Sequence, residues 1–146
     1  MADLNRALEA DNQFAAAWSR LAEVYGREAQ ALLRAGQPAR AVEQADELSR
    51  KPHCAGVALY QCAAIYARAV AALQHHKPFT MAQAGMAEQY TRQSVALLGR
   101  ADAAGFFAVP AHLEKLGKDP SFDSVRSSMG FKQWLADREE PSRPTR

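Results

Sequence analysis

The strongest constraint on the fold is the helical spacing of the apolar residues. Through most of the chain, large apolar residues and alanines recur three and four residues apart, which places them on one face of an α-helix. These stretches span residues 14–34, 38–49, 55–76 and 81–103. No segment offers a clear candidate for a strand. We therefore predict an all-α protein in which neighbouring helices form antiparallel αα-hairpins.

The residue composition favours the same fold. Of the 146 residues, 31 are alanine, whereas valine occurs seven times, threonine three times and isoleucine once. Alanine has the highest helix propensity, and β-branched residues are enriched in strands. Hydrophobic residues make up 48% of the chain and charged residues 23%, as is usual for a folded domain, so wholesale disorder is excluded.

Turn and capping residues mark the expected helix boundaries. Gly36 suits the left-handed position that ends a helix, and Pro38 suits the first turn of the next one. Thr80 and Gln83 have the spacing of a capping box, in which each side chain bonds to the backbone of the other residue. A helix is therefore expected to begin next to Thr80.

Charge and cysteine content bear on partners and location. The 18 Lys and Arg residues and 16 Asp and Glu residues give a net charge of +2, with both signs interspersed, so we expect no nucleic-acid partner. No window approaches the roughly 20 apolar residues of a membrane span, and the first residues lack the apolar region of a signal peptide. Cys54 and Cys62 are too few for a disulfide framework. We predict a cytoplasmic protein with reduced thiols and no membrane partner.

No set of side chains has the spacing of a metal or catalytic site. Cys54 and Cys62 are too far apart on one helix to share an ion, and His75-His76 is typical of a solvated helix end. Cys62 occupies a core position, which argues against a nucleophilic thiol, and no glycine-rich phosphate loop occurs. We predict no enzymatic activity, no metal and no cofactor. For Asp119 and Arg126 we predict a structural role, in which Asp119 caps a turn and Arg126 pairs with it or with backbone carbonyls.

Two helical windows share one pattern of residue sizes. Each has a large residue, another apolar residue three positions later, a small residue beside it and an aromatic residue three further on. The residues are Trp18, Leu21, Ala22 and Tyr25 in the first window and Leu59, Cys62, Ala63 and Tyr66 in the second. The pattern resembles helix A of the tetratricopeptide repeat, in which the small residue lets a partner helix come close. The resemblance implies a short right-handed superhelix of about two and a half repeats, with the six larger residues of the two windows buried between paired helices.

The repeat spacing departs from that family. Tyr25 and Tyr66 are 41 residues apart, whereas the family's unit has about 34 residues. We place the surplus directly after Tyr25, in a lengthened first helix of the unit.

The end of the chain carries a second resemblance. Residues 94–135 are similar to the closing segment of bacterial tetratricopeptide arrays, many of which follow a serine/threonine protein kinase domain. The residues that carry it are Leu98, Ala101, Gly105, Ala111, His112, Leu113, Asp119, Pro120, Phe122, Val125, Arg126, Phe131 and Leu135. The resemblance implies that the chain is the C-terminal piece of a bacterial kinase-type protein, although no kinase motif occurs in it.

We expect a single domain over residues 1–137. Its repeat helices span 3–104, beginning with a short helix at 3–10 that Asp11-Asn12 interrupts. A helical cap is expected over 105–137, with short helices at 109–116, 120–126 and 129–137. The last residues, 138–146, contain two prolines and almost no apolar side chain, which predicts a disordered tail.

The resemblance also implies a binding surface, because helix A lines the concave face of tetratricopeptide arrays. Mapped through the repeat, that face holds Ser19, Arg20, Glu23, Arg27, Val57, Tyr60, Gln61, Ala64 and Arg68. Three arginines and a tyrosine suit an extended acidic peptide, held by charge-assisted hydrogen bonds. The leading hypothesis is a non-enzymatic module that binds a peptide or protein partner. The alternatives are a structural repeat domain that packs in cis against a neighbouring domain of the same polypeptide, such as a kinase, and a face of ordinary solvated charges.

Overall fold

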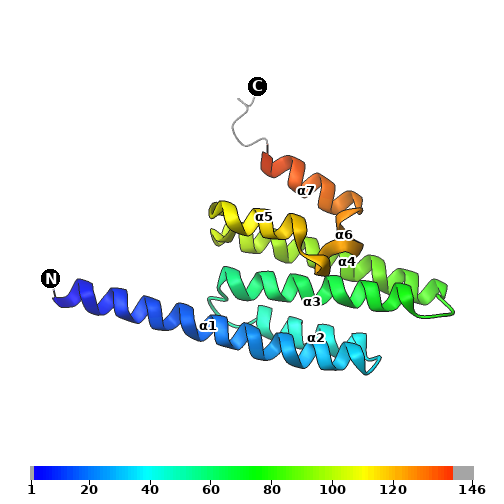
Figure 1. Ribbon diagram of the computed structural model, residues 1–146, viewed down its shortest axis with the longest axis horizontal. Helices are drawn as coiled ribbons and strands as arrows, with labels where there is room; N and C mark the ends of the chain where they lie inside the picture. Colours follow the sequence, from blue (N-terminus) through cyan, green and yellow to red (C-terminus); the bar gives the residue numbers. More distant parts are fainter. Residues whose placement is uncertain (1, 140–146) are drawn as a thin grey trace.

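The computed structural model describes residues 2–139, and the side chains of residues 14–138. Every regular element in this range is helical, as predicted (Figure 1). The α-helices are α1 (Ala2–Arg34), α2 (Pro38–Ser49), α3 (Gly56–His75), α4 (Met81–Ala103), α5 (Pro110–Lys118), α6 (Asp123–Arg126) and α7 (Met129–Glu139). Two 3-10 turns, η1 (Phe106–Ala108) and η2 (Pro120–Phe122), connect the later helices.

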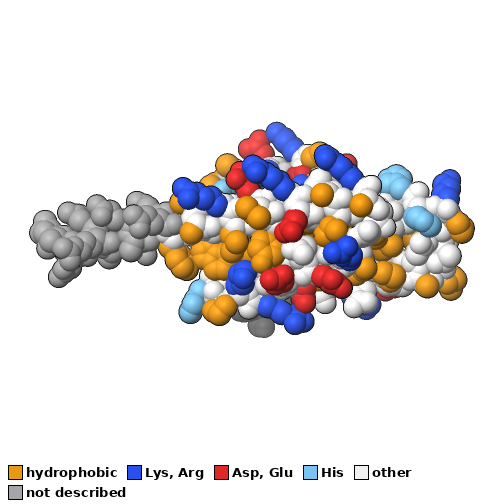
Figure 2. All heavy atoms as spheres, turned by 90° about the horizontal axis from the view of Figure 1, so that it is seen from below, with side chains coloured by type: hydrophobic (Ala, Val, Ile, Leu, Met, Phe, Trp, Pro, Cys, Tyr) orange, Lys and Arg blue, Asp and Glu red, His pale blue; other side chains and the backbone are white. Residues whose placement is uncertain are grey.

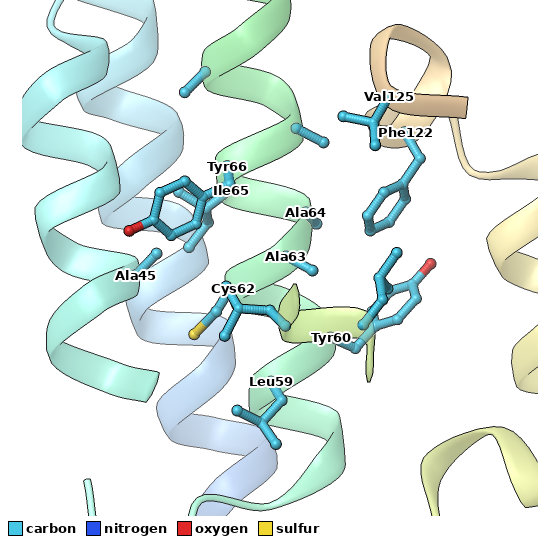
Figure 3. Packing of buried hydrophobic residues seen from close by; sticks show 14 of the residues in the cluster. Ala45, Leu59, Tyr60, Cys62, Ala63, Ala64, Ile65, Tyr66, Phe122 and Val125 are labelled. Atoms are coloured by element: carbon cyan, nitrogen blue, oxygen red, sulfur yellow. The ribbon is translucent and has the colours of Figure 1, made fainter. Parts of the chain in front are cut away.

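Helix α3 forms the centre of the protein. It packs against α1 and α2 on one side and against α4 on another, while η2 and α6 cover a further part of its surface. Figure 3 shows Phe122 and Val125 beside Tyr60 on one face of α3, with Tyr66 and Ala45 on the opposite face. Because α3 is enclosed in this way, the alanines from Ala58 to Ala69 are buried as fully as its large residues. The antiparallel pairs α1–α2 and α3–α4 therefore share one continuous core.

The two predicted size patterns lie in this core. Trp18, Leu59, Cys62 and Tyr66 are buried as expected, whereas Leu21 and Tyr25 are only half-buried. The small residue Ala63 has no exposed surface. Its carbonyl accepts a 2.8 Å hydrogen bond from the buried Ser94 hydroxyl of α4, so the two helices approach closely here.

Local signals set the helix ends as predicted. Gly36 has a φ of 75°, and the N–H groups of Gly36 and Gln37 bond back to Leu33 and Leu32. These two bonds satisfy carbonyls that the end of α1 would otherwise leave free. Both bonds of the capping box between Thr80 and Gln83 are present at the start of α4.

The expected interruption at Asp11-Asn12 is wrong. α1 continues from Ala2 to Arg34 as one helix, so there is no separate helix over 3–10. Asp and Asn cost a helix interior only about 0.7 kcal/mol relative to Ala, far less than the roughly 3 kcal/mol of Pro. Good helix formers on both sides outweigh that cost.

The C-terminal cap extends further than predicted. α5 ends at Lys118 and α7 at Glu139, and Ser128 caps α7 by accepting a hydrogen bond from the Phe131 N–H. Arg138, which we assigned to a disordered tail, lies in α7, where it pairs with Asp102 at 3.0 Å and donates to the Phe107 carbonyl at 2.6 Å. The rest of the predicted tail, residues 140–146, lies outside the described residues.

The expectation about membrane spans needs a correction. Among the described helices, α3 is long and apolar enough to cross a membrane by length and composition. However, 67% of this stretch is buried inside the protein, which is how a central helix of a bundle also reaches such a composition. The finding is weak evidence either way, and the cytoplasmic location stays a prediction.

Candidate functional site

A cleft of about 550 Å³ opens between α1, α3 and the C-terminal segment. Its lining residues are Ser19, Ala22, Glu23, Gly26, Arg27 and Gln30 from α1, Val57, Tyr60, Gln61 and Arg68 from α3, and Phe106 and Lys115 from beyond α4. A second cleft of about 510 Å³ shares Tyr60, Gln61, Arg68 and Lys115 and adds Ala64, Lys118, Asp119 and Pro120. We call the two clefts together the groove.

The floor of the groove depends on small residues of α1. Gly26 is buried, and a Cβ atom there would lie 2.0 Å from the Nε2 atom of Gln61. The Gln61 amide therefore occupies the place of a side chain on α1. With Ala22 one turn earlier, Gly26 leaves room for α3 to lie close to α1, so polar groups of both helices meet in one cleft.

The structure brings together most of the residues that the repeat mapping predicted. Ser19, Glu23, Arg27, Val57, Tyr60, Gln61 and Arg68 all line the first cleft, and Ala64 lines the second. Arg20 is exposed and lines neither cleft. It follows Ser19 by one residue, which turns its side chain about 100° around the helix. The structure therefore brings together every mapped residue but Arg20, and their role in binding stays a prediction.

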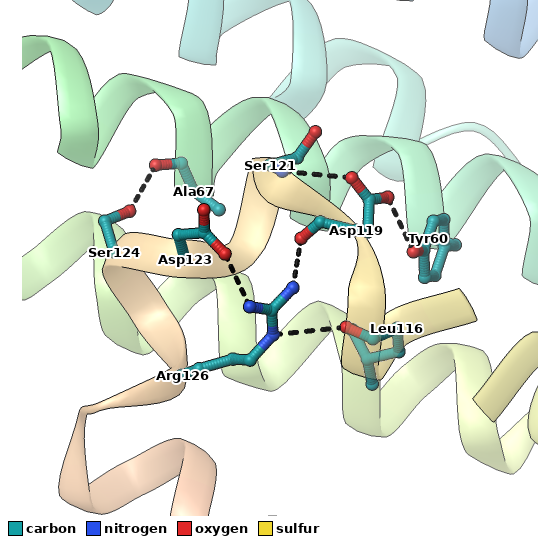
Figure 4. A network of polar contacts seen from close by, with 8 residues as sticks. All are labelled: Tyr60, Ala67, Leu116, Asp119, Ser121, Asp123, Ser124 and Arg126. Carbon is teal, nitrogen blue, oxygen red and sulfur yellow. Dashed lines mark hydrogen bonds and ion pairs between the residues drawn. The ribbon is translucent and has the colours of Figure 1, made fainter. Parts of the chain in front are cut away.

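Two of the predicted contact residues are already engaged by the chain itself, and Figure 4 shows the contact made by one of them, Tyr60. The Tyr60 hydroxyl donates to the carboxylate of Asp119 at 2.9 Å, and Asp119 also accepts from the N–H of Ser121 at 3.0 Å. Arg68 donates to the Ser121 hydroxyl at 2.9 Å and reaches Gln30 at 3.4 Å. Tyr60 is only 4% exposed. The start of η2 thus provides an acidic partner for Tyr60, and the α1 side of the groove remains open.

Burial and hydrogen bonding set the ionisation of the Tyr60–Asp119 pair. Burial, reinforced by the nearby Asp119 carboxylate, raises the pKa of the Tyr60 phenol. Burial also opposes ionisation of Asp119, but the hydrogen bonds from Ser121 and Tyr60 outweigh it and lower the pKa of this carboxyl from 3.8. At neutral pH a neutral phenol therefore donates to an ionised carboxylate.

Arg126 holds the turn that presents Asp119. Its guanidinium donates to the carbonyls of Leu116, at 3.3 Å, and of Asp119, and pairs with the Asp123 carboxylate at 2.5 Å. The predicted structural role is confirmed, with backbone carbonyls rather than the Asp119 carboxylate as partners. Figure 4 shows that these contacts join the end of α5 to α6.

The repeat mapping missed the contribution of the cap. Lys115 and Lys118 lie on α5, and Lys115 stands 5.4 Å from the centre of the Tyr60 ring. The mapping considered only the two predicted A helices, so it had no means to place a third segment on the groove. The sequence signal that could have indicated this contribution is the pair Lys115 and Lys118, three residues apart near the end of a short predicted helix.

The remaining candidate groups offer little chemistry. Within the described part of the chain, no group of three or more His, Cys, Asp or Glu side chains is arranged to hold a metal ion. Cys54 and Cys62 are free thiols, and burial raises the pKa of both. A protonated thiol is a poor nucleophile.

Comparisons with known proteins give no relative. No family model matches the chain, and no curated protein or solved structure matches it. The likeness to tetratricopeptide arrays therefore stays a prediction from the sequence.

Proposed function

We propose that this protein is a non-enzymatic interaction module whose groove binds an extended acidic segment of a protein partner. One observation carries the proposal: seven of the nine residues mapped to the concave face line a single cleft. They are joined there by a lysine of the cap.

A tetratricopeptide-like arrangement is part of this proposal. Two helical hairpins, α1–α2 and α3–α4, share a core, and α3 packs against both helices of the preceding pair. The close contact at Ala63 supports the assignment of α3 as a second helix A. On this reading α1 and α3 line the concave face, and residues 105–139 close the end of the array.

Charge and length favour an acidic, extended ligand. The first cleft presents Arg27, Arg68 and Lys115 against the single carboxylate of Glu23. From Ser19 to Gln30 the cleft follows about 16 Å of helix, a length that roughly five extended residues span. Arg27 and Lys115 are exposed, so their charged groups are available for charge-assisted bonds to carboxylates.

A labelled pool of acidic hexapeptides, titrated by fluorescence anisotropy, tests the proposal. Arg27→Gln and Lys115→Gln should each weaken binding about tenfold, since a hydrogen bond to a charged group contributes about 1.5–3 kcal/mol. Arg20→Gln is the matched control, because it removes an exposed arginine of the same helix outside the groove. Added salt should also weaken binding. Equal affinities for the Arg20 and Arg27 variants, or no saturable binding, would contradict the proposal.

A second candidate function is packing in cis against a neighbouring domain of the same polypeptide, such as a kinase domain. It is favoured by the first half of α1, which extends beyond the rest of the bundle in Figure 1. Phe14, on that part of α1, is 56% exposed, and charges of both signs are interspersed with apolar side chains on the face in Figure 2. In a protein that joins this chain to a candidate neighbouring domain, protection from hydrogen exchange confined to the part of α1 before Ser19 distinguishes this role from groove binding.

A further inference from the structure

A separate pocket of about 320 Å³ lies between α2, α3 and α4, away from the groove. Its lining residues are Val42, Glu43, Asp46, Arg50, Tyr66, Gln89, Tyr90 and Gln93. Tyr66 is six residues from Tyr60, which places the two side chains about 120° apart around α3. In Figure 3, Tyr60 and Tyr66 point to different sides of that helix. A ligand in this pocket would therefore not touch the groove.

Two tyrosines form the inner wall of the pocket. Their rings make a T-shaped pair, with centres 5.7 Å apart and planes at 68°. Each residue is 8% exposed, and among the described side chains neither hydroxyl has a hydrogen-bond partner, while no described side-chain oxygen is both buried and unpaired. Both hydroxyls therefore reach solvent at the pocket, where a ligand can bond to them.

The charges around the tyrosines are mainly negative. Glu43 has no ion-pair partner in the described part of the chain. Burial and the negative charge of Glu43 both raise the pKa of the Tyr90 phenol. Asp46 is close enough to act electrostatically on the Tyr66 phenol, and it pairs with Arg50 at 3.1 Å. The Arg50 side chain is 77% exposed, so this i,i+4 pair is weak and easily exchanged. Burial and the Asp46 carboxylate raise the pKa of Tyr66 to about 12, so the phenol stays neutral.

We propose that this pocket binds the cationic head of a guanidinium or ammonium compound. Aromatic walls at a steep angle attract a cation through their π faces. The Glu43 and Asp46 carboxylates neutralise its charge, and phenol and glutamine oxygens can accept its N–H groups. The volume suits one such head and its carbon stem. The cation comes either from an arginine or lysine side chain of a protein or from a free small amine.

The test uses the whole protein with ring-labelled tyrosines, titrated with L-argininamide and observed by NMR. The chain has four tyrosines, so Tyr25 and Tyr60 serve as internal references for Tyr66 and Tyr90. Only the Tyr66 and Tyr90 ring signals should shift, and the neutral isostere L-citrullinamide should shift neither. An arginine-containing peptide that binds more tightly than argininamide identifies a protein source, and equal or weaker binding identifies a free amine.

Charge variants make the assignment sharper. Glu43→Gln should weaken argininamide binding about tenfold, whereas Glu47→Gln, an exposed carboxylate of the same helix outside the pocket, should leave it unchanged. Arg50→Gln should strengthen binding several-fold, because it frees Asp46 and removes a competing cation. Tyr90→Phe keeps the ring and should weaken binding less than Glu43→Gln. The proposal is overturned if L-citrullinamide shifts the ring signals as much as L-argininamide does, or if the Tyr66 and Tyr90 signals do not shift. It is also overturned if Glu43→Gln leaves the binding of L-argininamide unchanged.

Discussion

The hydroxyl of Tyr60 and the carboxylate of Asp119 are 2.9 Å apart, although 59 residues separate them in the chain. The bond ties the central helix α3 to the start of η2. On the same face of α3, the Tyr60 ring packs 5.3 Å from the ring of the fully buried Phe122. One residue of α3 thus anchors the cap by both a polar and an apolar contact.

Tyr60→Phe should isolate the polar part of this anchor. The ring remains to pack against Phe122, while Asp119 loses one donor. We expect the free energy of unfolding to fall by about 1–2 kcal/mol, as for loss of a hydrogen bond to a charged group at a partly exposed site. Tyr25→Phe is the control, because no described hydrogen bond involves the Tyr25 hydroxyl. Equal denaturant midpoints for the two variants would show that the bond contributes nothing.

Asp119 should make stability depend on acid pH. Its pKa in the folded protein is lowered from 3.8, so its ionised form stabilises the fold above about pH 4. That contribution is lost as the pH falls through the folded-state pKa. The stability gap between the wild type and Asp119→Asn, measured by urea unfolding, should therefore narrow below pH 3.8. A gap that stays constant down to pH 2 would contradict this account.

Gly56 allows the start of α3 to contact η1. A Cβ atom at Gly56 would lie 2.8 Å from the Cβ of Phe106, an atom too near the backbone to move easily. Gly56→Ala should destabilise the protein by about 1–3 kcal/mol through overpacking. Gly85→Ala is the control, because a Cβ there meets nothing within 4 Å. In that helical position alanine should stabilise by about 0.5–1 kcal/mol. Thermal midpoints that move in the same direction would refute the contact.

Phe122 should be essential for docking the cap. Its side chain has no exposed surface, and Phe122→Ala should cost about 3–5 kcal/mol. Met129→Ala, at a residue 82% exposed, should change stability by less than about 0.5 kcal/mol. Truncation after Gly105 should expose the α3 and α4 surfaces that the cap covers and cause aggregation. A truncated protein that unfolds at the same temperature would show that the cap is dispensable.

Much of the helical framework could be predicted from the sequence because helix ends depend on neighbours. Pro38, Thr80 and Gln83 act within about one turn of their own positions, so α2 and α4 begin where the sequence indicates. The expected break at Asp11-Asn12 is absent for an equally local reason, since two weak helix formers do not end a helix that good helix formers flank.

Only part of the candidate site could be predicted from the sequence. Helical periodicity places Ser19, Glu23 and Arg27 on one strip of α1, and it needs no tertiary information to do so. The resemblance to the tetratricopeptide repeat also implied that Tyr60 contacts a partner. It could not reveal that Asp119 would reach that hydroxyl first, because the cap lies beyond α4 in the chain.

The sequence by itself determined which residues are helical and which share a helix face, because those properties follow from contacts three and four residues apart. Only the tertiary structure decided which faces meet. Lys115 joined the groove, and Tyr66 came together with Tyr90, because separate helices pack around α3. Contacts between residues of different helices depend on how whole helix surfaces fit together, and the spacing of residues within one helix does not predict them.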